Sequence, residues 1–245
     1  MKKNLFKALL VIATVLIFAS PCLAKKKVIK WKVQGFVPAG MLYHDTLVRL
    51  ADKVKKATGG RLIFEVHPAG ALVPPFEGIK AVSHGAYQAQ YSYSAMWVGK
   101  IPVSPLFTAS PGGLNTLGIW EVCKYVMLPG IHQPASQTEL IINKEAYAAL
   151  PDDLKSALKA AVNQSRLDEW LWMEQKNIEA VKFLKEKGIT WVTMDPKTVS
   201  TMQKWATEYL DKRASKDKNF AKVWNSIQKF GEQWYPYHKL YSLPH

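Results

Sequence analysis

Apolar and polar residues alternate along three short segments in the first half of the chain. Residues 28–34, 61–67 and 87–93 have the period of two that is typical of β-strands, with β-branched and aromatic members. Between them, residues 42–57 and 76–83 have the spacing of amphipathic helices. This βαβαβ order predicts parallel strands joined by right-handed crossovers, and hence an α/β fold.

The second half of the chain is mostly helical in pattern. A strand is predicted at 139–143, and a helix follows Pro151 for more than thirty residues without an internal proline or glycine. A short strand at 189–192 precedes helices at 196–212 and 219–234. Helical spacing favours core packing over ligand binding for the aromatic residues of these last two helices, which are Trp205, Tyr209, Trp224 and Phe230.

Residues 1–24 have the features of a cleaved secretory signal. Lys2, Lys3 and Lys7 precede an apolar run that is short for a bilayer-spanning helix, and a small-residue cleavage site ends at Ala24. A lipid anchor on Cys22 is the alternative, but Pro21 suits that modification poorly. We therefore expect a periplasmic protein.

Charge and cysteine content narrow the function further. The net charge is +14, but the lysines are scattered, which favours a solvated surface over a site that steers anions. Nucleic acid does not suit an exported protein as a partner, and Cys123 alone remains after the signal, so we expect no disulfide. The sequence contains no metal-binding histidine spacing, nucleophile elbow or phosphate-binding glycine loop, so we expect no enzyme activity.

Five short motifs in the first half nevertheless form a recognisable series. They are Ala57–Leu62, Val66–Pro74, Ala81–Tyr87, Trp97–Lys100 and Pro105–Thr108. In this order and spacing they resemble the first lobe of the DctP-type solute-binding proteins of tripartite ATP-independent periplasmic (TRAP) transporters. Among these, they are most similar to the branch that handles 2-oxo acids.

The resemblance implies a type II periplasmic-binding-protein fold with two lobes that close over a small organic carboxylate. It also implies delivery of that solute to the membrane permease subunits of a TRAP transporter. In this family a long helix such as the one after Pro151 spans the lobes or supports a homodimer.

The second half resembles the family in part only. Residues 124–134 are similar to the end of an aromatic helix with a Pro-Gly-x-His turn, so Tyr125 and Met127 are expected in a helix together with Cys123. The stretch Ser110–Thr116 reads either as a linker or, by comparison with the family, as the junction left by a missing segment. We expect a first lobe at 25–113 and a remnant second lobe with a helical region at 114–245.

The segment that is missing by this comparison holds the family's carboxylate-binding arginine and its metal-site residues. The four arginines of this chain, Arg49, Arg61, Arg166 and Arg213, lie in no matching context, and we expect no cofactor. Loss of one partner of a buried arginine–carboxylate pair costs about 2–5 kcal/mol. The resemblance therefore also allows a degenerate member that folds but binds its carboxylate weakly or not at all.

The remaining candidate ligand contacts follow the first and third predicted strands. In open α/β sheets, ligands lie beyond the carboxyl ends of the strands. By position we choose Gln34, Phe36, Tyr93 and Trp97. Core packing is an equal alternative for Trp97, and it is the stronger reading for Phe36.

Overall fold

The structure, a computed structural model, describes residues 27–97, 121, 124–130 and 138–241. Its main sheet has four strands in the order β2-β1-β3-β5. The first three of these strands are parallel, and they are β1 (Ile29–Gln34), β2 (Leu62–His67) and β3 (Ala89–Tyr93). The predicted α/β class and βαβαβ order are therefore confirmed.

The fourth strand comes from the second half of the sequence. Strand β5 (Thr138–Ile142) pairs with β3 in antiparallel orientation, with Thr138 opposite Tyr93. Because the two strands run in opposite directions, the start of β5 lies at the same sheet edge as the end of β3. The first lobe thus contains segments from both sides of the boundary expected at residue 113.

Helix α2 (Leu42–Ala57) crosses from β1 to β2 and covers one face of the sheet, as predicted. Its apolar stripe of Leu47, Leu50 and Val54 is buried against the sheet. Full burial of each such side chain contributes about 1.5–3 kcal/mol. Gly59 and Gly60, at φ 56° and 75°, then reverse the chain in a conformation that side chains with a Cβ disfavour.

A short connection on the sheet's other side joins β2 to β3. It consists of the 3₁₀ turn η1 (Pro75–Glu77) and helix α3 (Gly78–Ser83). A Cβ on Gly78 would lie 2.6 Å from the side-chain oxygen of Gln90, so any other residue here would require the buried Gln90 side chain to move.

The core of the first lobe joins residues that are far apart in sequence. Trp31 and Phe64 stack between neighbouring strands with ring centroids 5.8 Å apart. Leu154 and Leu158 of helix α5 (Asp152–Glu186), which lie some ninety residues later, are buried in the same cluster. Helix α4 (Lys144–Ala148) leads from β5 into α5 and begins with an Asn143 cap that accepts from the Ala146 amide.

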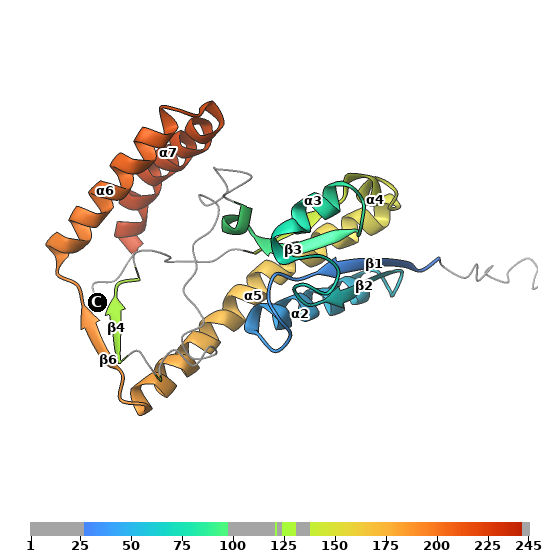
Figure 1. Cartoon of the computed structure of the whole chain (residues 1–245), viewed down its shortest axis with the longest axis horizontal. Helices are drawn as coiled ribbons and strands as arrows, with labels where there is room; N and C mark the ends of the chain where they lie inside the picture. Colours follow the sequence, from blue (N-terminus) through green and yellow to red (C-terminus); the bar gives the residue numbers. More distant parts are fainter. Residues whose placement is uncertain (1–26, 98–120, 122–123, 131–137, 242–245) are drawn as a thin grey trace, which may run out of the picture.

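Helix α5 (Asp152–Glu186) has 35 residues and so extends about 50 Å. Asp152 and Asp153 occupy its first turn, where carboxylates favour the helix dipole, and Gly188 at φ 73° follows its end. Its first half packs on α2 and the sheet, whereas its second half leaves the first lobe and runs to the start of β6 (Figure 1). The predicted long helix is confirmed.

A second, two-stranded sheet lies at the far end of α5. Strand β4 (Tyr125–Leu128) pairs in parallel with β6 (Thr190–Thr193). The expectation of a helix through Tyr125 and Met127 is therefore wrong. Tyr-Val-Met-Leu fits a strand as well as a helix, and pairing with β6 decides between them.

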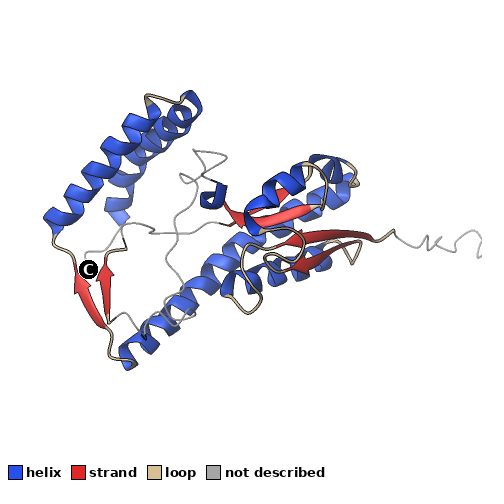
Figure 2. Ribbon diagram, in the orientation of Figure 1, coloured by secondary structure: helices blue, strands red, loops and turns tan. Residues whose placement is uncertain are grey.

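Helices α6 (Pro196–Ala214) and α7 (Lys218–Tyr241) form an antiparallel pair beyond β6 (Figure 2). Asp195 caps α6 by accepting from the Thr198 amide, and Asp211 accepts from the Trp224 indole at 2.7 Å. The expectation of core positions is wrong for three aromatic residues of this pair, which remain largely exposed: Trp205, Tyr209 and Phe230. Helix α6 has no buried residue, and Phe220 of α7 is buried, so the contact between the two helices leaves these three rings uncovered by the described residues.

Several expectations fall outside the described residues. They concern the signal over residues 1–24, the stretch Ser110–Thr116, and Cys123. Within the described parts of the chain, no helix is both long and apolar enough to cross a membrane.

Candidate ligand-binding edge of the first lobe

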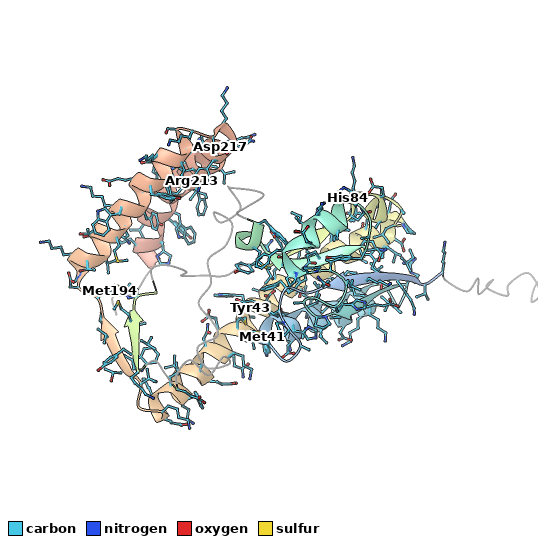
Figure 3. All side chains as sticks on the ribbon, viewed as in Figure 1. Met41, Tyr43, His84, Met194, Arg213 and Asp217 are labelled. Carbon is cyan, nitrogen blue, oxygen red and sulfur yellow. The ribbon has the colours of Figure 1, made fainter. Side chains whose placement is uncertain are left out.

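The carboxyl ends of β1 and β3 lie together at one edge of the sheet. Phe36 follows β1, and Tyr93 ends β3. Helix α2 begins at the same edge, and its N-cap residue Met41 and its first-turn residue Tyr43 lie at the end of the first lobe that faces the second sheet (Figure 3). Loops and helix starts at this edge are where open α/β folds bind ligands.

Four aromatic rings meet at this edge. The Phe36 ring lies at centroid distances of 5.3 Å from Tyr43, 5.1 Å from Tyr93 and 6.1 Å from Tyr91. We call Phe36, Tyr43, Tyr91 and Tyr93 the edge aromatic cluster. The tilted ring pairs have the geometry that aromatic quadrupoles favour. The cluster forms a rigid wall with apolar faces and phenolic hydroxyl groups.

Gln34 lies behind this wall and is fully buried. Its side-chain oxygen accepts from the amides of Leu72 and Val73 at 2.7 and 3.1 Å, and its side-chain nitrogen donates to the Val73 carbonyl at 3.0 Å. The side chain therefore fixes the loop after β2 against the end of β1. A direct contact between Gln34 and a ligand stays a prediction.

Trp97 follows β3 and is also buried, with 2% of its surface exposed. Its indole nitrogen donates to a carboxylate oxygen of Glu139 at 3.1 Å, which links the end of β3 to the edge strand β5. These contacts account for Trp97 as a packing residue. Of the four predicted contacts, the edge brings Phe36 and Tyr93 together and places Gln34 and Trp97 behind it.

A network of hydroxyl groups ends on Glu169 of helix α5. The Tyr91 hydroxyl lies 2.8 Å from the hydroxyl of Thr46, 2.9 Å from that of Thr138 and 3.1 Å from a carboxylate oxygen of Glu169. Thr138 in turn donates to the Glu169 carboxylate, at 3.0 and 3.1 Å from its two oxygens. The network thereby ties α2, β3, β5 and α5 together beneath the edge aromatic cluster.

Burial decides the protonation preferences in this network. It raises the pKa of the Glu169 carboxyl, while hydrogen bonds from Thr138 and Tyr91 and the charge of Arg166 oppose part of that rise. Burial, and secondarily the Glu169 charge, also raises the pKa of the Tyr91 phenol. Tyr91 is therefore a neutral hydrogen-bonding group at physiological pH.

Sequence reasoning did not find Thr46, Thr138 or Glu169. The one signal for Glu169 is its register on α5, because it follows the buried positions Ala161 and Ser165 along one helical stripe. A carboxylate at such a position requires hydrogen-bonding partners. Those partners come from other elements, which spacing along α5 does not reveal.

Two imidazole nitrogens near the sheet edge lack hydrogen-bond partners among the described residues. They are Nδ1 of His44, in the first turn of α2, and Nε2 of His67, at the end of β2. Within the same described residues, no three His, Cys, Asp or Glu side chains come together as potential metal ligands. The described part of the edge therefore offers no ligand set for a metal ion.

The comparisons with known proteins agree with this fold. Residues 113–217 match the family model described as bacterial extracellular solute-binding protein, family 7 (DctP). A monocarboxylate 2-oxoacid-binding periplasmic protein of Nostoc sp. is 23% identical over 185 residues, covering 76% of this chain and 46% of the relative. The chain thus spans about half the length of this curated relative.

Solved structures of TRAP solute-binding proteins have a similar fold. One from Colwellia psychrerythraea, with bound calcium and pyruvate, has a TM-score of 0.80 at 16% identity and covers 88% of this chain and 98% of its own. One from Bordetella bronchiseptica, with copurified calcium and picolinate, has a TM-score of 0.80 at 15% identity, with coverages of 88% and 95%. The matched family consists of solute-binding proteins rather than enzymes. The family-model match and the curated relative support the resemblance to DctP-type proteins predicted from the motifs, and the chain has the type II fold of TRAP solute-binding proteins.

Proposed function

We propose that this chain is the extracytoplasmic solute-binding subunit of a TRAP-type transporter and captures a small organic carboxylate of the 2-oxo acid type. The observation that carries the proposal is the edge aromatic cluster, which lies where α/β binding folds hold their ligands. The ligands of similar proteins support the substrate class, since two solved relatives contain pyruvate. Export to the periplasm and docking to permease subunits are part of the same proposal.

The start of helix α2 adds partial positive charge at this edge, and Asp45 in its first turn offsets part of it. Met41, at the N-cap position, provides no side-chain hydrogen bond to the first turn. Amide groups at a helix start carry partial positive charge and bind carboxylates. A carboxylate above the first turn of α2 would place the rest of a small ligand against the rings of Phe36 and Tyr93.

The absence of the family's arginine motif from the sequence sets the expected affinity. Without a bidentate cation, the binding free energy falls by about 2–5 kcal/mol. A ligand with a dissociation constant of about 1 μM would then bind with a dissociation constant in the range of about 0.03–5 mM. The competing function is a degenerate member that folds without binding any carboxylate.

Titration calorimetry with pyruvate and longer 2-oxo acids separates these two functions. We expect saturable heat from the original protein. The affinity should be at least tenfold lower in Tyr93→Ala and in Phe36→Ala. Tyr235→Ala removes an aromatic ring that is 74% exposed on α7 and is the matched control, with unchanged affinity expected. Absence of saturable heat with all 2-oxo acids, from a protein shown to be folded by circular dichroism, would favour the degenerate function.

A further inference from the structure

A groove runs along the flank of the first lobe, between α5, β5 and α2. Its volume is about 210 Å³, which suits a ligand smaller than most cofactors. Leu50, Leu140 and Val162 form its apolar walls. Ser165 and Arg166, together with Glu169 one turn later on α5, present polar groups to it. Apolar walls with a few placed polar groups are typical of small-molecule sites.

Arg166 and Glu169 carry opposite charges but do not pair with each other. They lie one turn apart on α5, and neither makes an ion pair within 4 Å among the described residues. The charge of Arg166 acts on Glu169, but its guanidinium forms no ion pair or hydrogen bond within the part of the chain that the structure describes, although it is the side chain best suited to fork onto a carboxylate. The groove therefore contains a cation that is available to an anionic group.

Glu169 is held differently. Hydroxyl groups of Thr138 and Tyr91 fix its carboxylate at 3.0–3.1 Å, without a cationic partner. The carboxylate of Glu139 also lines the groove and accepts from the Trp97 indole. A partly buried carboxylate gains most from a cation that enters beside it, because desolvation strengthens the attraction. One end of the groove is thus built for a positive group.

We propose that this groove binds a small zwitterion, namely an α-amino acid with a short apolar side chain. The ligand carboxylate bonds to the Arg166 guanidinium, the ammonium group lies beside Glu169, and the side chain contacts Leu50, Leu140 and Val162. The spacing of one helical turn between Arg166 and Glu169 suits a molecule whose two charged groups share one carbon. This site differs from the carboxylate site proposed at the edge aromatic cluster, with which it shares Tyr91.

Calorimetric titration of the full chain with L-valine tests the proposal. Valine is compared with N-acetyl-L-valine, which lacks the ammonium group, and with L-valine amide, which lacks the carboxylate. We expect saturable binding of valine and at least tenfold weaker binding of each blocked analogue. Equal binding of valine and either analogue, or no binding of valine, would overturn the proposal.

Substitutions in the groove and on the exposed side of α5 test whether valine binds in the groove. Arg166→Gln should weaken valine binding at least tenfold, whereas Lys159→Gln removes an exposed charge from the same helix and should leave it unchanged. Glu169→Gln should also weaken binding at least tenfold, with Glu174→Gln as its exposed control. Arg166 is exposed, so its substitution decides the matter even where Glu169→Gln alters folding. Unchanged affinity in Arg166→Gln would contradict the proposal.

The edge variant Tyr93→Ala distinguishes the two proposed sites. It should weaken 2-oxo acid binding, and its affinity for valine should stay within about twofold of that of the original protein. Valine binding that fails while pyruvate binding persists would refute the groove alone. The reverse result would refute the edge site alone. Loss of valine binding in Tyr93→Ala would place the zwitterion at the edge instead and overturn the groove assignment.

Discussion

The first lobe and the region formed by β4, β6, α6 and α7 differ sharply in how far their apolar side chains are buried. In the first lobe, Val33, Leu47 and Leu62 have no exposed surface. In the other region, Trp205 and Tyr235 are 63% and 74% exposed. The contrast shows that the first lobe completes its own core, whereas the described residues of the second region leave much apolar surface uncovered.

The comparison also locates where stability resides within α5. Its residues up to Ser165 are buried at intervals of three to four, but Leu167, Leu171 and Ile178 are more than half exposed. Tertiary packing rather than helical propensity supplies most of the stability of a protein helix. The cost of a substitution should therefore depend on which half of α5 it lies in.

The largest expected effect comes from truncating the buried half. Leu158→Ala should lower the free energy of unfolding by about 2–5 kcal/mol, because it removes contacts and leaves a cavity. Leu171→Ala makes the same chemical change in the second half of α5. It should change the free energy of unfolding by no more than about 0.5 kcal/mol. Urea unfolding followed by circular dichroism measures both. Similar losses in the two variants would show that the second half of α5 is packed as well.

A smaller loss of stability is expected where Gln34 supports the loop behind the edge aromatic cluster. Gln34→Ala leaves the amides of Leu72 and Val73 without their acceptor and should cost about 1–3 kcal/mol. Gln233→Ala, on the exposed face of α7, is the matched control and should be neutral. Chemical denaturation midpoints report both, and a neutral Gln34→Ala would mean that the loop is held by other contacts.

Glu169, whose carboxylate lies beneath the edge aromatic cluster, should make the free energy of unfolding depend on pH. Burial raises the Glu169 pKa above its ordinary value of 4.5, so the folded state favours the protonated form. That stabilisation is complete below the ordinary value and is lost as pH rises through the raised one. Glu169→Gln keeps the neutral form, so its stability relative to the original protein should increase from acidic to neutral pH.

Thermal unfolding of Glu169→Gln and the original protein at a series of pH values measures this difference. Glu174→Gln, on the exposed side of α5, should show a difference that does not vary with pH. A constant difference for Glu169→Gln as well would indicate that its carboxyl has the same pKa in the folded and unfolded states.

The smallest effect is expected for an ion pair at the border of the first lobe. Lys53 of α2 donates to Asp168 of α5, and both side chains are partly exposed. Lys53→Gln should therefore cost no more than about 1 kcal/mol. The loss should shrink as salt is added, because ions screen exposed charges. A larger, salt-independent loss would show that Lys53 acts through packing of its aliphatic chain.

The sequence predicts the first lobe well because its signals are local. Alternation along 28–34 and the helical stripe from Leu47 to Val54 each specify one element, and the βαβ order specifies how the elements connect. Tyr125 and Met127 were assigned wrongly because four residues do not distinguish strand from helix without their partner β6. The meeting of Thr46, Tyr91, Thr138 and Glu169 depends on contacts across 31 to 78 residues, which periodicity does not encode.

For the same reason, the sequence predicts the candidate site only in part. Position after a strand places Phe36 and Tyr93 at the same edge of the sheet, where their rings are in contact. It does not reveal that the amide of Gln34 serves the loop at Leu72, or that Trp97 bonds to Glu139. Those roles depend on neighbours that the tertiary fold brings together.

The two halves of α5 have a consequence for the dynamics of the backbone. We expect its amide protons up to Ser165 to exchange with solvent when the first lobe opens, and those just after Leu171 to exchange through local opening of the helix. Hydrogen–deuterium exchange should therefore fall into two kinetic classes within one unbroken helix. The boundary between them should lie near Glu169, where the hydroxyl network makes the last tertiary hydrogen bonds to the sheet. One secondary-structure element would thus belong to two cooperative unfolding units.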